Sequence, residues 1–566
     1  MFDPIETIEF EIREIIRKAV SEKIDIELEE SPEGKGDLTF PCFKLASKLK
    51  KPPNEVSKEL FEKMIKGLKK SDIVTSANVI GPYINFFIKN ETLTKLTIPT
   101  ILDRRELYGY HEKKGKKIIL EHTSANPTGP LHVGRARNPI IGDTLARVMR
   151  KNGYDVETQY FMNDMGKQSA TLVWGYYNIN EEELEPANRD KGDHFLVRFY
   201  QKASELAEEK NNEIESYLYK YEKREQEFVR RFRDICYQIL GSIIISLQRI
   251  NVNIDKFVWE SNFISDTSDI ISKLKEKGYL KEEGGAYYLD LSNYGFDEEQ
   301  KKLFLTRKDG LTLYPLRDIA YHISKFKSCD IAINVLGEDH KLEAKQLNTA
   351  LELLGIEKKP EVIFYSFISL PEGKMSVRKG RVVYLDDLID EAIDRAIKKV
   401  KNKEFEEAKK IGEIVGIGAI RYNILRVQAD KPIVFDWEDA LNFDGNSAPF
   451  IQYAHARACS ILKKAEHFEW KEKFSSLLCE LDEIELIKTL AKFPKTIEKC
   501  AEDKKVHRLA NYSYVLAVAF NQFYDKIPVL KAEKDYREAR LALVDASKWV
   551  LRNALDTMGI SAPKSM

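Results

Sequence analysis

One segment, residues 117–162, constrains the fold more than any other part of the chain. Lys117–Glu121 is a short apolar strand, and a glycine-bearing loop, Thr123–Gly134, follows it. A helix is expected near Pro139–Lys151, because Asn152 and Gly153 form a suitable C-cap pair, and Asp155–Met162 then alternates as a strand. This order of strand, loop, helix and strand predicts the start of a doubly wound parallel sheet.

The sheet is expected to continue much later in the chain. Ile331–Leu336 and Val362–Phe367 are short apolar runs of the parallel-strand type, with a helix over Leu342–Leu354 between them. The intervening region, about 176–300, is highly charged and helical in pattern. We interpret it as a helical insertion, because strand-like runs resume only after it.

Two further domains are expected on either side of the sheet. Residues 1–112 read as a small α/β domain, 113–400 as the split Rossmann-like domain, and 401–566 as an all-helical bundle. The helical part should break at the prolines Pro449, Pro494, Pro528 and Pro563. The predicted fold class is therefore multidomain α/β plus all-α.

The charge of the chain is balanced overall but unevenly distributed. Its 90 Lys and Arg residues face 91 Asp and Glu residues, which excludes a polybasic chain and an acidic disordered tail. Residues 1–30 carry ten acidic and four basic groups, whereas residues 31–90 carry eleven basic and six acidic groups. With no signal-like start and no long apolar run, we expect a cytoplasmic protein with reduced thiols and no membrane contact.

The first chemical motif is His132-Val133-Gly134-Arg135, where the loop enters a helix. A helix N-terminus favours phosphate, and His132 can donate a hydrogen bond to phosphate oxygens as charge develops. Gly134 allows a flat purine close to the backbone, while Arg135 and Arg137 add cationic donors. This motif predicts a nucleotide site, although a lone histidine in so short a pattern is more often structural.

The second motif is Pro371–Val383, which contains Lys374, Met375 and Ser376. Its four cations and flanking glycines suggest a loop that stabilises a triphosphate in the transition state. A solvated basic loop is the alternative for this segment taken alone.

Together, the two motifs resemble those of the class I aminoacyl-tRNA synthetases, whose signatures are H-I-G-H and K-M-S-K-S. In finer detail the chain resembles the arginyl-tRNA synthetases. The supporting segments are Lys374–Asp387, Leu316–His322, Asn163–Gly166, Phe443–Pro449, Gln452–Arg457 and Leu555–Met566.

The resemblance implies a two-step reaction. Arginine and ATP give arginyl-adenylate and diphosphate, and the arginyl group then passes to the 3'-terminal adenosine of tRNA(Arg). It implies catalytic roles for the two motifs, at His132, Gly134, Arg135, Lys374, Met375 and Ser376. It also implies an arginine site formed by Glu121, Ser124, Asn126, His132, Tyr314 and Asp318. The implied ATP site shares His132 and adds Gly134, Arg135, Gly337, Asp339, His340 and Lys374.

Elementary chemistry agrees with the arginine assignment. A guanidinium is planar and always charged, so it requires a carboxylate such as Asp318, and Tyr314 can stack on it. Such a pocket rejects other amino acids without editing. Asp318 could instead cap its helix, and Asp339 and His340 could contact ribose or magnesium or merely cap the helix after them.

Two positions depart from the family signatures. Arg135 replaces the second histidine of H-I-G-H, and Val377 replaces the second lysine of K-M-S-K-S. Arg378, Lys379 or Arg135 could compensate for that lysine. We expect Mg²⁺ to arrive with ATP, no structural metal, and a monomer.

The resemblance assigns the N-terminal domain to the tRNA elbow and the C-terminal helices to the anticodon. Tyr83, Asn85 and Phe87 alternate on one strand and either contact an unstacked base or pack a small sheet. The corresponding candidates in the bundle are Asn521, Phe523, Tyr524, Val529 and Arg540, whose helical spacing is also typical of core packing.

Two other functions compete with this interpretation. A tRNA-independent nucleotidyltransferase would leave the flanking domains without a role. A non-enzymatic RNA-binding relative is disfavoured by the presence of His132, Asp318 and Lys374.

Overall fold

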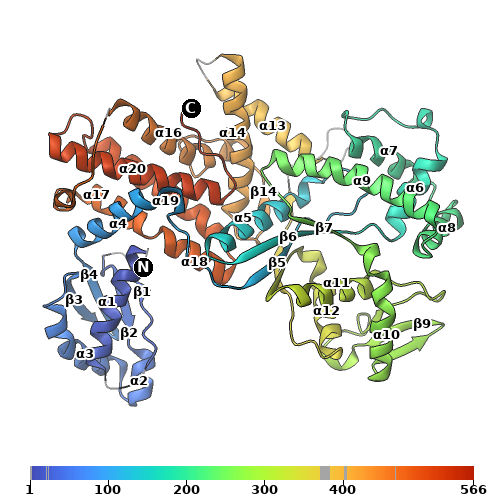
Figure 1. Cartoon of the computed structure of the whole chain (residues 1–566), viewed down its shortest axis with the longest axis horizontal. Helices are drawn as coiled ribbons and strands as arrows, with labels where there is room; N and C mark the ends of the chain where they lie inside the picture. The colour runs from blue at the N-terminus through green and yellow to red at the C-terminus, as the bar shows by residue number, and fades with distance from the viewer. Residues whose placement is uncertain are drawn as a thin grey trace.

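The computed structural model describes residues 3–20, 22, 24–32, 34–369, 383–400, 404–465 and 467–566. The predicted catalytic residues Lys374, Met375 and Ser376 lie outside the described residues. A parallel sheet occupies the centre of the molecule (Figure 1). The N-terminal domain and the C-terminal helices lie at one end, and the segment containing α6–α12 lies at the other.

The central sheet confirms the doubly wound prediction. Its five strands are parallel and have the order β12-β11-β5-β6-β7. Their bounds are β5 Lys117–Glu121, β6 Asp155–Met162, β7 Lys256–Trp259, β11 Ile331–Gly337 and β12 Glu361–Tyr365. The crossover from β5 to β6 is α5, Arg137–Lys151, nearly all of whose residues are buried.

The expectation that strands resume only after residue 300 is wrong. β7 pairs with β6 in the central sheet, so the helical crossover ends before residue 256. That crossover contains α6 Lys167–Asn178, α7 Gly192–Glu205, α8 Asn211–Glu222 and α9 Gln226–Arg249.

A second, antiparallel sheet lies between β7 and β11 in the chain. Its order is β10-β9-β8, with β8 Leu280–Glu283, β9 Ala286–Asp290 and β10 Lys302–Phe304. The neighbouring helices are α10 Thr267–Glu276, α11 Tyr314–Ser328 and α12 Lys341–Leu353. The packing of α10 and α11 forms a separate apolar core around Leu274 and Leu316.

The N-terminal domain is an antiparallel sheet with helices, as predicted. The sheet order is β1-β2-β4-β3, with β1 Glu29–Glu30, β2 Leu38–Pro41, β3 Val74–Ile80 and β4 Tyr83–Ile88. Its helices are α1 Pro4–Ala19, α2 Phe43–Leu49 and α3 Pro53–Leu68. Ile8, Ile12 and Ile16 of α1 are fully buried, which explains the apolar periodicity of that helix.

The C-terminal part is helical, with one exception. Its helices are α13 Leu385–Lys399, α14 Phe405–Leu425, α15 Trp437–Ala440, α16 Ala448–Lys464, α17 Leu481–Ala491, α18 Phe493–Asp503, α19 His507–Lys526 and α20 Lys534–Thr557. A two-residue strand, β14 Ile433–Val434, pairs with β13 Ile368–Ser369. Pro449 and Pro494 lie in first helical turns, and Pro528 follows the end of α19, as the fixed φ of proline requires.

Candidate active site

The loop that leaves β5 is strained where the predicted arginine site begins. Thr123 and Ser124 have φ angles of 70° and 38°, a region that costs roughly 1–3 kcal/mol for a residue with a side chain. Asn138 of α5 holds this turn, because its Oδ1 accepts from the Thr123 N–H at 2.6 Å. Ser124 Oγ in turn donates to Glu121 at 3.0 Å and accepts from the Phe161 N–H.

A cavity of about 290 Å³ opens at the carboxyl ends of β5, β6 and β11. This is where open α/β sheets bind ligands. The structure brings five of the predicted arginine residues together here, Glu121, Ser124, Asn126, Tyr314 and Asp318, whereas the sixth, His132, does not line this cavity. The lining includes Glu121, Ser124, Asn126, Arg135, Phe161, Asn163, Tyr314, Asp318, His322, Asn334 and His340.

A chain of hydrogen bonds connects Glu121 and Asp318, two of the carboxylates that line this cavity. Lys325 Nζ donates to Glu121 Oε2 at 2.6 Å and to Asn334 Oδ1 at 2.8 Å. The Asn334 amide lies 2.8 Å from His322 Nε2, and His322 Nδ1 lies 2.9 Å from the Asp318 carbonyl and 3.1 Å from its carboxylate. Because Asn334 donates, the remaining His322 proton belongs on Nδ1 and points at Asp318.

We call these five residues, Glu121, Lys325, Asn334, His322 and Asp318, the carboxylate relay. Sequence reasoning missed Lys325 and Asn334. The available signal was a polar residue, Asn334, inside an otherwise apolar strand. His322 is buried as well.

Tyr314 and Asp318 lie one helical turn apart at the start of α11. The N-terminus of α11 has no side-chain cap, so the capping alternative for Asp318 is wrong. The Asp318 side chain is partly exposed toward the cavity, and the Tyr314 side chain is half exposed. Burial, and then the negative charges of Glu343 and Asp318, raise the pKa of Tyr314 to about 12, so its hydroxyl keeps its proton.

His132 ends the loop and begins a 3₁₀ turn, Val133–Arg135. Its Nδ1 accepts a hydrogen bond from the Gly134 N–H at 3.0 Å. Desolvation and then the Arg135 charge lower the pKa of His132, so the ring is neutral at neutral pH. The proton therefore lies on Nε2, where it is available to a ligand.

Arg135 and Arg137 have different environments. The Arg135 guanidinium is exposed and lies 3.7 Å from the carboxylate of Asp339. Arg137 is fully buried and donates to the carbonyls of Ser366, Gln428 and Lys431. The prediction that Arg137 adds a donor for phosphate is therefore wrong, because its donors are used inside the protein.

Gly337 is the last residue of β11, one residue beyond the predicted strand end, and Asp339 and His340 follow it. A Cβ on Gly337 would lie 2.2 Å from Asp339 Oδ1, so only glycine allows this carboxylate to fold back. Neither Asp339 nor His340 caps α12 with its side chain, which leaves both side chains at the surface of the site.

A second cavity, of about 440 Å³, adjoins the first and shares Asn126, Asn163 and Tyr314 with it. Lys167 and Arg307 give it positive charge. Tyr314 lies at the boundary between the two cavities. A ligand in one cavity can therefore reach a ligand in the other at this point.

The candidate tRNA residues of the N-terminal domain are unequally exposed. Tyr83 is exposed and packs edge-on against the exposed Phe43, with ring centroids 5.6 Å apart. Asn85 is buried and donates to Asn78 at 3.1 Å, and Phe87 is half-buried. Tyr83 and Phe43 together form the aromatic surface that could stack on a base.

Two of the C-terminal candidates lie at the surface and three in the bundle. Phe523 and Val529 are core residues, and Arg540 is held by Glu483 at 2.7 Å. Tyr524 and Asn521 are half-buried and meet at Arg457, whose guanidinium donates to Asn521 and lies 5.4 Å from the Tyr524 ring centre.

Arg457 also lies over the exposed Tyr453, 4.9 Å from its ring centre. We call Tyr453, Arg457, Asn521 and Tyr524 the aromatic–arginine cluster. Its two α16 members were part of the family motif but were not among the predicted contacts.

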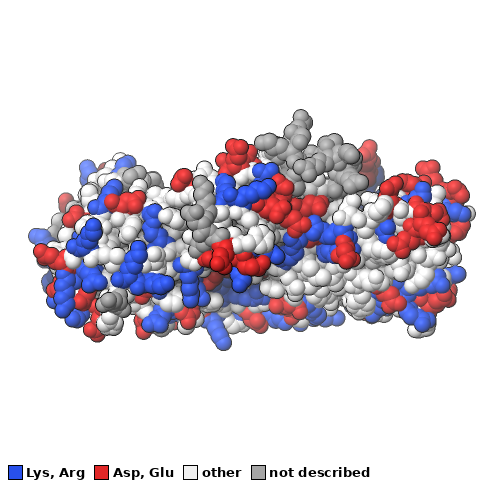
Figure 2. Space-filling view, turned by 90° about the horizontal axis from the view of Figure 1, so that it is seen from above, with Lys and Arg blue, Asp and Glu red and all other residues white. Residues whose placement is uncertain are grey.

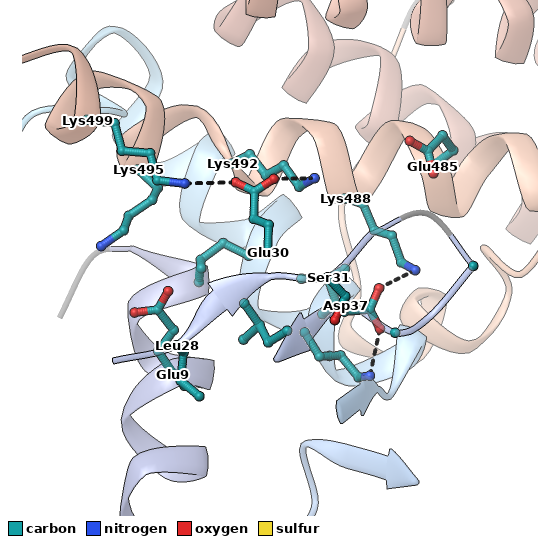
Figure 3. Close-up of a pocket in the computed structure, with 16 residues that line it drawn as sticks. Glu9, Leu28, Glu30, Ser31, Asp37, Glu485, Lys488, Lys492, Lys495 and Lys499 are labelled. Atoms are coloured by element: carbon teal, nitrogen blue, oxygen red, sulfur yellow. Dashed lines mark hydrogen bonds and ion pairs between the residues drawn. The ribbon is translucent and has the colours of Figure 1, made fainter. Parts of the chain in front are cut away.

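A third cavity, of about 320 Å³, lies between the N-terminal domain and the C-terminal helices. Figure 3 shows a row of lysines from α17 and α18 facing acidic residues of the N-terminal domain. Glu30 pairs with Lys492 and Lys499 at 3.4 and 3.1 Å, and Asp37 pairs with Lys488. These interdomain ion pairs engage Lys488, Lys492 and Lys499, whereas Lys495 pairs with Glu498 of its own helix.

The surface charge is polarised, as the sequence predicts. Seen from above, Lys and Arg side chains are spread over the end formed by the C-terminal helices, while acidic side chains gather near the centre and at the opposite end (Figure 2).

Two features are absent from the part of the chain that the structure describes. No three His, Cys, Asp or Glu side chains are placed to hold a metal ion. No helix there has the length and apolar character needed to cross a membrane.

Comparison with known proteins gives matches over the whole chain. The family model described as "tRNA synthetases class I (R), catalytic domain" matches residues 97–437. "Arginyl tRNA synthetase N terminal domain" matches residues 6–88, and "DALR anticodon binding domain" matches residues 451–566.

Individual relatives agree with these matches. A protein of Methanocella arvoryzae named arginine–tRNA ligase is 47% identical, covering 96% of this chain and 96% of its own. One of the same name from Methanocaldococcus jannaschii is 43% identical over 98% of each chain. The structure superposes on that of Thermus thermophilus arginyl-tRNA synthetase with a TM-score of 0.82 and 26% identity, covering 98% of this chain and 99% of that one.

Proposed function

The chain belongs to the arginyl-tRNA synthetase family, and from this membership we infer which of its residues perform each step of the reaction. The protein is an arginine–tRNA ligase that uses ATP. Arginine attacks the α-phosphate of ATP through its carboxylate, releasing diphosphate, and the arginyl group of the adenylate then passes to the 3'-terminal adenosine of tRNA(Arg), releasing AMP.

We propose that the first cavity holds the arginine side chain between Asp318 and Glu121. The observation that carries this proposal is the carboxylate relay, which orients both carboxylates toward one space. Glu121 is already paired with Lys325, so Asp318, with Glu343 at the same cavity, supplies negative charge for the guanidinium. Tyr314, Ser124 and Asn126 complete the polar lining.

We assign the triphosphate to the region of His132 and Arg135. The neutral His132 ring donates through Nε2, and Arg135 adds a fixed positive charge. Gly134 and Gly337 leave room for the nucleotide, and His340 contacts the ribose. Asp339 is the exposed carboxylate beside them and would hold a Mg²⁺ ion carried by ATP, which offsets phosphate charge.

Lys374, Met375 and Ser376 are proposed to complete this site from the segment outside the described residues. No side chain needs to act as a general base, because positioning and charge stabilisation account for this chemistry.

For tRNA we propose three regions. Residues 1–112 take the elbow, with Tyr83 and Phe87 beside Asn85, and residues 113–400 take the acceptor end. Residues 401–566 take the anticodon, where Asn521 and Tyr524 are half-buried at the surface and Phe523 and Arg540 support them from the core. The active species is proposed to be a cytoplasmic monomer.

The deciding experiment is ATP–pyrophosphate exchange with each amino acid, with and without tRNA. Exchange with arginine that depends on tRNA supports the function, and exchange with another amino acid would refute it. Asp318→Asn should lower kcat/KM for arginine by roughly 10³-fold or more, because the buried donors of the pocket lose their charged partner. Asp269→Asn, an exposed position on α10, is the matched control.

A further inference from the structure

The segment Val383–Leu385 is paired directly with the His132 loop. The Val133 N–H donates to the Val383 carbonyl at 3.1 Å, and the Leu385 N–H donates to the Leu131 carbonyl at 2.7 Å. Tyr384 therefore lies opposite His132 in an antiparallel bridge. A displacement of this segment would move the backbone that carries His132.

A buried carboxylate fixes the same segment from its other side. Asp386, in the first turn of α13, is almost fully buried. It accepts hydrogen bonds from Lys191 at 2.7 Å, Ser246 at 2.9 Å and Arg249 at 2.8 Å. Lys191 precedes α7, whereas Ser246 and Arg249 belong to α9, so all three donors come from the helical crossover.

Lys191 has no unused donor in this arrangement. Its Nζ also donates to Asp193 at 3.1 Å and to Ser246 at 2.5 Å, and its side chain is 10% exposed. Burial opposes ionisation of Asp386, but the bonds from His194, Lys191 and Ser246 hold the pKa of its carboxyl well below the usual value. The pair is therefore charged and well ordered.

A second set of contacts reaches Tyr384 itself. Arg189 contacts Asp390 and lies 3.4 Å from Asp387, and Asp387 accepts from the Tyr384 N–H at 3.1 Å. The His194 ring packs edge-on against the Tyr384 ring, with centroids 5.1 Å apart.

Fold stability alone does not explain such a network. Replacing a buried ion pair by apolar residues of similar size is often neutral or stabilising, because desolvation offsets the attraction. Ion pairs do restrict orientation, since a bidentate guanidinium accepts only a narrow range of geometries. Arg249 uses both ends of its guanidinium, one on Asp386 and one on Asp390.

We propose that the helical crossover positions His132 for adenylate formation, with Lys191 and Arg249 acting through Asp386, and Arg189 acting through Asp387, to hold Val383–Leu385 against the His132 loop. These are positioning residues, because they touch neither arginine nor ATP in the proposed site. The inference rests on the phosphate role proposed for His132.

The test compares Lys191→Met with Lys202→Met in the full-length protein. Lys202 lies in α7, the helix that Lys191 precedes, and it forms an exposed pair with Glu205. In arginine-dependent ATP–pyrophosphate exchange with tRNA, Lys191→Met should lower kcat roughly 10- to 100-fold through misplacement of the reacting groups, with KM for arginine unchanged. Lys202→Met should leave both constants unchanged.

Arg249→Lys is the second variant, because lysine keeps the charge but cannot bridge two carboxylates. It should lower kcat in the same way, to a smaller extent. Circular dichroism reports whether each variant is folded.

A folded Lys191→Met protein with wild-type kcat would overturn the proposal, as would a rise in KM for arginine that matches the loss of kcat. If Lys191→Met does not fold, wild-type kcat in Arg249→Lys overturns it. If neither folds, the network is a folding element and the proposal is wrong. Absence of arginine exchange in the wild-type protein would instead refute the enzymatic function.

Discussion

His132 shows how one side chain receives its chemistry from its immediate neighbours. The hydrogen bond from the Gly134 N–H occupies Nδ1, and the nearby Arg135 charge disfavours a second proton. The ring is therefore a neutral donor with a fixed direction. The order of residues predicts a phosphate donor here, but the protonated nitrogen follows only from the geometry of the turn.

The pH dependence of the enzyme should reflect this state. Because the pKa of His132 lies below the usual 6.5, the ring stays neutral until the pH falls below that value. Protonation of Nδ1 then removes the acceptor for Gly134. We expect kcat for exchange to be constant down to pH 6.5 and to decline at lower pH.

His132→Ala should lower kcat roughly 10²- to 10³-fold, the usual cost of removing one such donor, and should abolish this acidic decline. The measurement is kcat against pH for both proteins. An identical acidic decline in the variant would show that another group titrates.

The neighbouring arginines show a limit of what a local sequence pattern predicts about single side chains. Arg135 and Arg137 are two residues apart in one turn and look equivalent in sequence. Arg137 points into the protein and Arg135 does not, because the carbonyls that accept from Arg137 come from distant segments around Ser366 and Lys431. No local pattern contains that information.

Pairs of elements create the arginine site. α11 supplies Asp318, His322 and Lys325 at successive turns, and β11 supplies Asn334 opposite them. The helical spacing predicts that the three α11 residues share a face. The hydrogen bonds that connect these residues to Glu121 depend on the pairing of β11 with β5, which places Asn334 opposite Glu121.

Breaking the carboxylate relay at Lys325 should affect both stability and arginine use. Lys325 is 2% exposed and Glu121 is 6% exposed, so Lys325→Met leaves a buried, unpaired carboxylate. We expect about 3–5 kcal/mol of lost stability, as for other broken buried pairs, and a higher KM for arginine. Urea unfolding and arginine-dependent exchange measure the two effects.

Lys327→Met is the control, since Lys327 is exposed two residues further along α11. Equal unfolding midpoints for the two variants would contradict the importance of the Lys325–Glu121 pair.

Short strands are the elements that sequence patterns miss. β7 has four residues, too few for periodicity to distinguish it from a loop, and β14 has two. Each exists because a partner strand is already in place, β6 for β7 and β13 for β14. Longer elements such as β6 and α5 contain enough residues for their patterns to be read directly.

Across the whole molecule, polar contacts join the domains. Arg421 of α14 is fully buried and donates to Asp143 of α5, to the Ile250 carbonyl after α9 and to the Met558 carbonyl after α20. At the other interface, Glu30 and Asp37 meet the α17–α18 lysines (Figure 3). These contacts link α14 to α5 and the N-terminal domain to α17 and α18.

The aromatic–arginine cluster provides a test of tRNA binding at this scale. Arg457→Met removes a cation that holds Tyr453, Tyr524 and Asn521, and stacking on such groups is worth about 1–3 kcal/mol per base. We expect KM for tRNA to rise roughly tenfold with KM for arginine unchanged. Aminoacylation kinetics at several salt concentrations measure both.

Lys463→Met, on the exposed surface of the same helix, should change KM for tRNA little. A fall in arginine affinity, or equal effects of the two substitutions, would argue against a contact at Arg457.

The sequence by itself determined the family, the two-step chemistry and the parallel sheet. It also determined the order of the domains along the chain: a small α/β domain, the domain with the parallel sheet, and a helical bundle. It could do so because these depend on local patterns and on motifs of neighbouring residues. The tertiary structure alone decided which motif side chains reach the cavity and how Lys325 and Asn334 connect Glu121 with Asp318. It also decided how residues of the helical crossover bind the Asp386 carboxylate. Those contacts join residues far apart in the chain, and their energies depend on burial and geometry that arise only when the elements pack.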